Sequence, residues 1–238
     1  MAWSKGYGWA NIKAKVRSDP DRTVQNIGSV SKTVTATAIM QLVERGVPEL
    51  DEDVNTYLPF AVRSPHHPDV PITCRHLLTH RSSIADGPAY GASYACGDPT
   101  VDLRSWVEGY LTPKGRYYDA KTNFQPWLPG EQGQLVGAIG RNYSNVGFGL
   151  LGFLAGEVAG VPFARYCREH IFAPLGMNRT GWSLGEVGLA NHAVPYLPEP
   201  KTPSDAAAEM ASGLLGTEVE RESAGAAGYL PFCHRDDA

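Results

Sequence analysis

Long apolar runs are missing from this sequence. No stretch of about 18 consecutive apolar residues, the length that crosses a bilayer as a helix, occurs among its 238 residues, so no transmembrane helix is expected. Residues 1 to 9 also lack the apolar core of a secretory signal peptide. A cytoplasmic location is therefore the default expectation, unless a leader precedes residue 1.

Cysteine is scarce, and its spacing argues against the usual cysteine frameworks. The four cysteines are far apart and form no Cys-x-x-Cys pair: Cys74, Cys96, Cys167 and Cys233. This pattern favours reduced thiols in the core or at the surface over a disulfide framework or a zinc site. Neither a metal nor an organic cofactor is implied.

A large excess of charge is also lacking. The net charge is -4, from 21 basic and 25 acidic side chains, so neither nucleic acid nor an anionic membrane surface is expected as a partner. Hydrophobic residues make up 42% of the chain and charged residues 19%, which is ordinary for a globular protein with a sizeable core. The length suits one large domain or two interleaved lobes.

Local patterns predict one early strand and several helices. Residues 6 to 16 read as a short strand, and a helix is expected from about Ser29 to Arg45, ended by Gly46. Frequent prolines between positions 48 and 129 break the following region into loops and short helices, at 74 to 80 and 100 to 111. Longer helices are expected at 146 to 159 and, with Pro162 in its first turn, to about Phe172.

A serine and a lysine three positions apart form the most informative pair. Ser29 and Lys32 would share one face of the predicted helix, one turn apart. A serine hydroxyl is a weak nucleophile until a base stands within hydrogen-bond reach, and a partly desolvated lysine can be that base. The alternative interpretation is an ordinary N-capping serine and a solvated lysine.

A polar triad follows more than a hundred residues later. Residues 143 to 145 read Tyr-Ser-Asn and lie at a loop-to-helix junction, the kind of triad that accompanies Ser-x-x-Lys in penicillin-recognising enzymes. Tyr143 could exchange a proton with a nearby serine, and Asn145 could hydrogen-bond a substrate amide. The alternative is a simple helix cap, with Ser144 or Asn145 as the N-cap residue.

Five segments together carry a family resemblance. They are residues 27–33 (Ile-Gly-Ser-Val-Ser-Lys-Thr), 50–59 (Leu-Asp-Glu-Asp-Val-Asn-Thr-Tyr-Leu-Pro), 75–83 (Arg-His-Leu-Leu-Thr-His-Arg-Ser-Ser), 143–152 (Tyr-Ser-Asn-Val-Gly-Phe-Gly-Leu-Leu-Gly) and 174–180 (Pro-Leu-Gly-Met-Asn-Arg-Thr). In this order and spacing they resemble the serine β-lactamase and penicillin-binding-protein superfamily, in its class C-like esterase branch. Ser83 stands where that family has glycine.

The resemblance implies an α/β fold of the α+β type, in which helices flank an antiparallel sheet. Residues 1–238 would form a single β-lactamase-like catalytic domain, with a mostly helical lobe at about 47–190 and a sheet lobe built from the two ends. Ser29 would be the acylated nucleophile and Lys32 its proton acceptor. Tyr143 would act as general base and acid, Asn145 would orient the substrate, and the backbone N–H of Ser29 would be one oxyanion donor.

The expected function is that of a serine hydrolase acting through an acyl-enzyme on a small ester, amide or β-lactam, with carboxylesterase activity favoured. The family's third motif, Lys-Thr-Gly or His-Thr-Gly, does not occur after Tyr143. Residues 210–217 resemble the segment that precedes that motif, and residues 218–238 match nothing in the family. The alternative is therefore a truncated, catalytically impaired chain that acts as a binding or interaction protein.

Two other patterns point to different chemistry. Residues 147–152 fit the dinucleotide pattern Gly-x-Gly-x-x-Gly, but they follow a polar loop rather than an apolar strand, so close helix packing is the favoured explanation. His76 and His80 have the i, i+4 spacing of zinc ligands. The glutamate of the metalloprotease motif is absent between them, which favours structural histidines.

Overall fold

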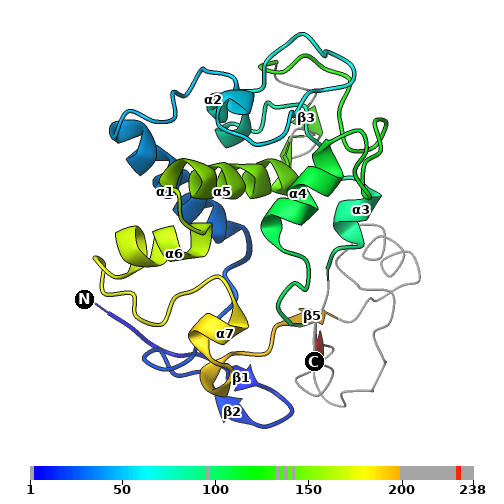
Figure 1. Cartoon of the computed structure of the whole chain (residues 1–238). Helices are drawn as coiled ribbons and strands as arrows, with labels where there is room; N and C mark the ends of the chain where they lie inside the picture. The colour runs from blue at the N-terminus through cyan, green and yellow to red at the C-terminus, as the bar shows by residue number, and fades with distance from the viewer. Residues whose placement is uncertain are drawn as a thin grey trace. The chain divides into compact units, whose positions relative to one another are not determined.

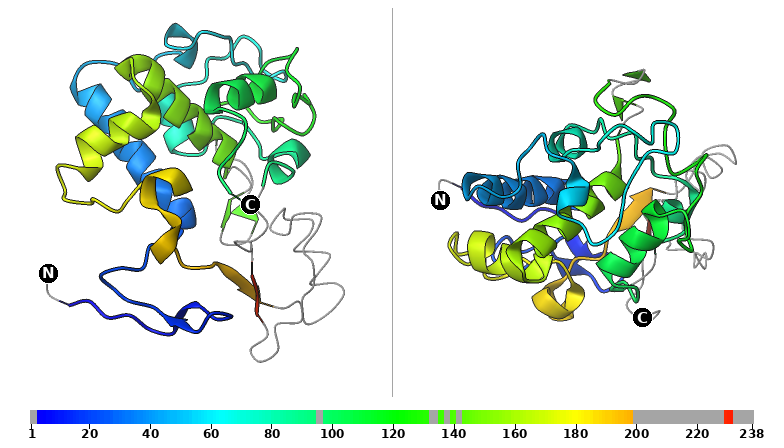
Figure 2. Two further views of the ribbon diagram at one scale, coloured as in Figure 1. Left: turned by 60° about the horizontal axis from the view of Figure 1, so that its bottom comes forward. Right: turned by 45° about the horizontal axis from the view of Figure 1, so that its top comes forward.

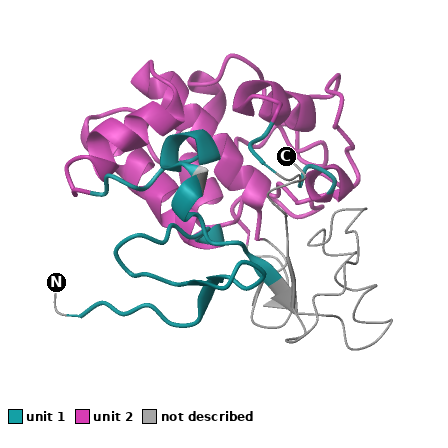
Figure 3. Cartoon of the chain, turned by 90° about the horizontal axis from the view of Figure 1, so that it is seen from below, with its two compact units in different colours: residues 1–28, 92–99, 177–238 teal, residues 29–91, 100–176 magenta. Residues whose placement is uncertain are grey.

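The computed structural model describes residues 3–94, 97–131, 135–136, 139–140, 143–198 and 229–231. The chain divides into two compact units, which Figure 3 draws in different colours. The smaller unit comprises Met1–Gly28, Ala92–Pro99 and Met177–Ala238, and the larger unit comprises Ser29–Gly91 and Thr100–Gly176. Cys96, Cys233 and the segment 210–217 lie outside the described residues. All four predicted site residues belong to the larger unit.

Helices dominate the larger unit (Figure 1). Its α-helices are α1 (Ser31–Glu44), α2 (Cys74–Leu78), α3 (Pro88–Gly91), α4 (Leu103–Leu111), α5 (Asn145–Ala159) and α6 (Phe163–Cys167). The larger unit also contains the last two residues of the 3₁₀ turn η1 (Gly28–Val30) and the 3₁₀ turn η2 (Val54–Thr56). The π-helical turn η3 (Arg168–Phe172) and the strand pair β3 (Leu135–Val136) and β4 (Ile139–Gly140) complete it.

Helix α5 forms the centre of this unit. It contacts α1, α2, α4 and α6, and the two views of Figure 2 show α1 alongside it. Leu150, Leu151 and Leu154 are fully buried. A Cβ atom on Gly152 would lie 3.4 Å from the Phe163 ring. Of the three glycines in this pattern, only Gly152 faces α6: a Cβ on Gly147 would face Ser144 and Leu77, and one on Gly149 would have no neighbour within 4 Å.

Several predicted helices begin later than the sequence indicated. The helix expected from residue 100 begins at Leu103, because the Asp102 side chain accepts a hydrogen bond from the Ser105 N–H and caps it. The prediction that Pro162 lies in the first turn of its helix is wrong. Pro162 is the N-cap residue of α6, with an extended ψ of 137°. The predicted helix to Phe172 is correct in extent, but its second half is the π-helical turn η3.

The buried thiols agree with the cysteine pattern. Cys74 and Cys167 both lie in the core of the larger unit, and burial raises the pKa of the Cys74 thiol to about 12. No single helix in the described part of the chain is long and apolar enough to cross a membrane. Only the pair Asn145–Ala159 and Phe163–Phe172, taken together across a 78° bend, reaches that length and composition.

The smaller unit holds a hairpin where the sequence predicted one strand. β1 (Trp9–Asn11) pairs antiparallel with β2 (Val16–Arg17). The chain turns between them because the Ala14 N–H donates to Asn11 Oδ1 at 2.8 Å and Lys15 adopts a left-handed φ of 53°.

The remaining elements of this unit come from the C-terminal part of the chain. They are α7 (Leu184–Val187), the 3₁₀ turn η4 (Leu189–Asn191) and the antiparallel pair β5 (Tyr196–Pro198) and β6 (Tyr229–Pro231). Among the described residues, the expected antiparallel sheet is represented by three separate two-stranded pairs. The predicted helices are therefore confirmed more fully than the predicted antiparallel sheet.

The burial of α5 predicts a large difference between two leucine truncations. Leu154 is 0% exposed in the core, whereas Leu175 in the same unit is 69% exposed. We expect Leu154→Ala to lower the free energy of unfolding by about 2–5 kcal/mol, since it removes buried methyl groups and leaves a cavity. Leu175→Ala should change it by less than about 0.5 kcal/mol. Urea denaturation checks this, and equal losses would contradict the placement of the core.

Candidate active site

Ser29 lies in the 3₁₀ turn that leads into α1, and Lys32 lies in the first turn of that helix. Lys32 Nζ donates a hydrogen bond to Ser29 Oγ at 3.2 Å. Ser29 is exposed, while Lys32 is half-buried. The structure therefore brings this pair together with the spacing that the sequence predicted.

Tyr143 joins this pair from a segment 114 residues away. Its hydroxyl lies 2.6 Å from Ser29 Oγ, and either oxygen could be the donor. Lys32 Nζ lies over the Tyr143 ring, 4.7 Å from its centroid, and 5.7 Å from the centroid of Phe148. An ammonium over an aromatic face is attracted by the ring quadrupole, so these contacts help to hold the lysine beside the serine.

Asn145 completes the group. Its Oδ1 accepts a hydrogen bond from Lys32 Nζ at 2.5 Å. The serine hydroxyl therefore contacts the lysine and the tyrosine directly, and the lysine contacts the asparagine. All four residues that the sequence singled out converge in one place, although 113 residues separate Lys32 from Asn145.

Asp86 is a residue of this site that the sequence analysis did not identify. Its carboxylate accepts hydrogen bonds from the backbone N–H groups of Asn145 and Val146, at 2.9 and 3.0 Å. It also accepts from Asn145 Nδ2 at 2.7 Å and from Ser144 Oγ at 3.3 Å. An acidic residue near a helix N-terminus is physically expected, but no spacing rule links position 86 to position 145.

Ser144 caps α5, as one interpretation of the triad predicted. Its Oγ accepts a hydrogen bond from the Gly147 N–H at 2.9 Å. Its own backbone N–H donates to His80 Nδ1 at 3.1 Å. The cap and the site are therefore built from the same three-residue segment.

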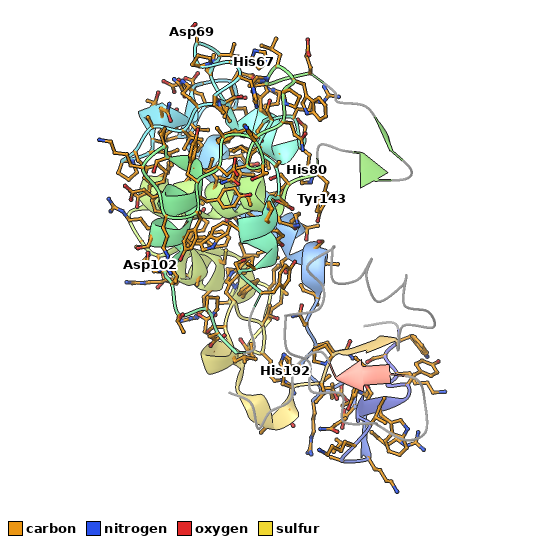
Figure 4. All side chains as sticks on the ribbon, turned by 90° about the vertical axis from the view of Figure 1, so that its right-hand side faces the viewer. His67, Asp69, His80, Asp102, Tyr143 and His192 are labelled. Carbon is orange, nitrogen blue, oxygen red and sulfur yellow. The ribbon has the colours of Figure 1, made fainter. Side chains whose placement is uncertain are left out.

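His80 supports the site rather than a metal. Its ring lies 4.5 Å from that of Tyr143 and 5.0 Å from that of Phe148, and Figure 4 shows His80 and Tyr143 next to each other. Burial, and then the positive charge of Lys32, lower the pKa of His80, which keeps the ring neutral and Nδ1 able to accept. In the described part of the chain, no three His, Cys, Asp or Glu side chains converge as metal ligands.

The Ser83 position explains a departure from the family pattern. Ser83 adopts a left-handed φ of 66°, a conformation that glycine reaches without steric cost. Its hydroxyl donates to the Trp127 carbonyl at 2.6 Å, which helps to hold the strained backbone. A serine therefore fits at the position where the family resemblance leads one to expect glycine.

This arrangement can perform acyl transfer. A serine hydroxyl with a lysine amine and a tyrosine hydroxyl in hydrogen-bond reach has two groups that can move its proton. The nucleophile and two groups that could move its proton are thus brought together from residues 29, 32 and 143. The role of the Ser29 N–H as an oxyanion donor stays a prediction.

Comparison with known proteins points to the same family as the sequence motifs. A family model described as Beta-lactamase matches residues 1–229. The chain is 31% identical to a β-lactamase of Yersinia enterocolitica over 192 residues, which is 80% of this chain and 42% of that protein. It is 27% identical over 179 residues to the D-alanyl-D-alanine-carboxypeptidase/endopeptidase AmpH of Escherichia coli K12, 75% of this chain and 42% of that protein.

A solved structure supports the likeness. The octameric penicillin-binding protein homologue of Pyrococcus abyssi superposes with a TM-score of 0.58 at 28% identity, over 83% of this chain and 42% of that one. The chain thus spans about two fifths of the length of the relatives named here.

The neutral state of His80 predicts an acid-dependent loss of stability. Because its pKa is lowered in the folded protein, the unfolded protein binds more protons just below the ordinary histidine pKa of about 6.5. Stability should therefore fall as the pH drops from about 6.5 toward the lowered pKa, and be independent of His80 above that window. Urea midpoints measured at about pH 7.5 and about pH 5.5 check this.

A matched pair of variants isolates His80 from other titrating groups. His80→Asn keeps an acceptor for the Ser144 N–H and tolerates the φ of 57°, yet does not titrate. It should lose less stability on acidification than the wild-type protein. His66→Asn, at an exposed histidine, should behave as the wild type does. An unchanged acid loss in His80→Asn would rule out this role.

Proposed function

Since the chain belongs to the Beta-lactamase family, whose model matches residues 1–229, we propose that it is a serine hydrolase that works through an acyl-enzyme at Ser29. The observation that carries the proposal is the position of Ser29 Oγ, 3.2 Å from Lys32 Nζ and 2.6 Å from the Tyr143 hydroxyl. These are the distances at which a proton can leave the serine as it attacks.

In the proposed acylation, Lys32 reacts in its neutral amine form: Ser29 Oγ bonds to the substrate carbonyl carbon while its proton passes to the Lys32 amine, directly or by way of Tyr143. The tetrahedral intermediate then collapses. The bond to the leaving group breaks, and where that group needs a proton, Tyr143 donates one and is reprotonated by Lys32. Water attacks the acyl-enzyme in a second cycle, which frees the carboxylic acid and restores the Ser29 hydroxyl.

We propose a small ester as the preferred substrate. An alkoxide or phenoxide leaves a tetrahedral intermediate more readily than an amine does, because an amide nitrogen must be protonated first. Esters therefore demand less of the proton donor at Tyr143 than amides or β-lactams do. Amides and β-lactams are the other members of the proposed substrate class, since the relatives named above include a β-lactamase and a carboxypeptidase.

The alternative function is a binding or interaction protein that acylates slowly or not at all. This alternative applies to the 238 residues as they stand, in which neither Lys-Thr-Gly nor His-Thr-Gly follows Tyr143. In the family resemblance, the strand that carries this triplet supplies a second oxyanion donor, and losing one such donor costs on the order of 100- to 1,000-fold in rate. The labelling experiment below separates the two functions.

The hydrolase proposal predicts covalent labelling of Ser29. Incubation with a fluorophosphonate, or with a penicillin-type probe, should add one probe mass to the protein. Peptide mapping should place it on Ser29, because this hydroxyl contacts both proton-transfer groups. Ser31→Ala should label as the wild type does, and Ser29→Ala should not label. A label on Ser31, Ser82 or Ser144 would refute the assignment, and no label on the folded wild type would favour the binding protein.

The proton acceptor is tested by a charge-conserving change. Lys32→Arg keeps the positive charge but cannot accept a proton near neutral pH, so release of p-nitrophenol from a p-nitrophenyl ester should slow on the order of 100- to 10,000-fold. Lys114→Arg, at an exposed lysine of the same unit, is the matched control and should not slow it. If folded Lys32→Arg released p-nitrophenol at the wild-type rate, Lys32 would not be the proton acceptor.

A further inference from the structure

We propose that Asp86 is a positioning residue for the reaction at Ser29: its carboxylate sets the orientation of the Asn145 amide and, through that amide, the place of Lys32. This inference rests on the proposed hydrolase function. It assigns a role to a residue that neither the Ser-x-x-Lys pair nor the Tyr-Ser-Asn triad contains.

The first argument is the direction of the Asn145 amide. Its two ends have nearly the same shape, so packing alone does not decide which end faces Lys32. Asp86 Oδ2 accepts from Asn145 Nδ2 at 2.7 Å, and an ionised carboxylate can only accept. The amide oxygen is therefore left to face Lys32 Nζ, where it accepts a hydrogen bond. The reverse orientation would place an NH2 group against the Lys32 donor.

The second argument is that Asp86 holds the backbone as well as the amide. The same carboxylate accepts from the N–H groups of Asn145 and Val146, so both the main chain and the side chain of Asn145 are tied to one group. The Asp86 carboxylate also accepts from the hydroxyl of Ser144, which is the residue next to Tyr143. A shift of this carboxylate would therefore move Asn145 and the segment that carries Tyr143.

The third argument separates positioning from ordinary helix capping. Ser144 already caps α5 through the Gly147 N–H. Asp102 is an ordinary capping carboxylate by comparison: it accepts hydrogen bonds from the N–H and the hydroxyl of Ser105, three residues along in the helix that it caps. Asp86 instead comes from a segment 59 residues before Asn145 and bonds a side chain that contacts Lys32.

The first test is Asp86→Asn, which keeps the size of the side chain and removes the charge. The NH2 group of the new amide is a donor, and it would face N–H and O–H groups of residues 144–146 that also donate. We expect acylation of the folded variant by a p-nitrophenyl ester to slow on the order of 100-fold, through a lower kcat rather than a higher KM, because the reacting groups are misplaced.

Asp102→Asn is the matched control for loss of a capping carboxylate, and Figure 4 shows Asp102 well apart from His80 and Tyr143. It should acylate at the wild-type rate and melt at or slightly below the wild-type temperature, since asparagine is also a good N-cap residue. Should Asp86→Asn not fold, Asp86→Ser keeps a small acceptor beside the helix start without reaching Asn145, and the same slowing is expected. A folded Asp86 variant that acylates at the wild-type rate would overturn the proposal.

A double-mutant cycle tests whether Asp86 acts through Asn145. In an Asn145→Ala background, Asp86→Asn should slow acylation by no more than about twofold, because the group that Asp86 orients is already gone. If the two changes instead multiply, Asp86 acts on the site by another route and the proposed role is wrong. If Asp86→Asn acted only through a general loss of stability, it would slow acylation by the same factor in the wild-type and the Asn145→Ala backgrounds.

The same measurements distinguish failure of this inference from failure of the proposed function. If the wild-type protein forms no acyl adduct, the hydrolase proposal fails, and the Asp86 role fails with it. If the wild type labels at Ser29 and folded Asp86→Asn labels at the same rate, the hydrolase proposal stands and only the Asp86 role is overturned. Slow labelling of Asp86→Asn beside normal labelling of Asp102→Asn supports both.

Discussion

The beginning of α5 must have hydrogen-bond acceptors, and the site depends on how that need is met. The first N–H groups of a helix have no partner inside the helix, and leaving them buried and unpaired is costly. Here the Asp86 carboxylate accepts from two of them, and Ser144 Oγ accepts from a third. The helix start is thereby held by residues outside the helix, and the Tyr-Ser-Asn segment is held with it.

The consequence is a site that joins two distant parts of the chain through few atoms. Ser29 and Lys32 come from the start of α1, while Tyr143 and Asn145 come from the start of α5. The two helices contact each other in the core, so the packing of their apolar faces sets the distance between their polar starts. The geometry of the proposed reaction tolerates little displacement, so the acceptors that hold the start of α5 also matter for the proposed function.

Residues 80 and 86 were beyond the reach of sequence reasoning. His80 belongs both to a zinc-like pair and to the 75–83 segment of the family resemblance, and no residue around it indicates that its Nδ1 accepts from the Ser144 N–H. Asp86 is an unremarkable acidic residue between an alanine and a glycine. Both act across long sequence separations, and local patterns carry information only about neighbours within a turn or a strand pair.

The sequence by itself determined the reactive pair and the helices that carry it. The three-residue spacing of Ser29 and Lys32, the glycine-rich apolar stretch of α5 and a helix cap at Ser144 or Asn145 all follow from local rules, and the motifs around them pointed to the family. Only the tertiary structure decided that the Tyr143 hydroxyl contacts Ser29 Oγ and that His80 is a neutral acceptor. It also decided that the Asp86 carboxylate accepts a hydrogen bond from the Asn145 side chain. These contacts arise from packing between helices, and a side-chain pair more than fifty residues apart leaves no periodic trace in one sequence.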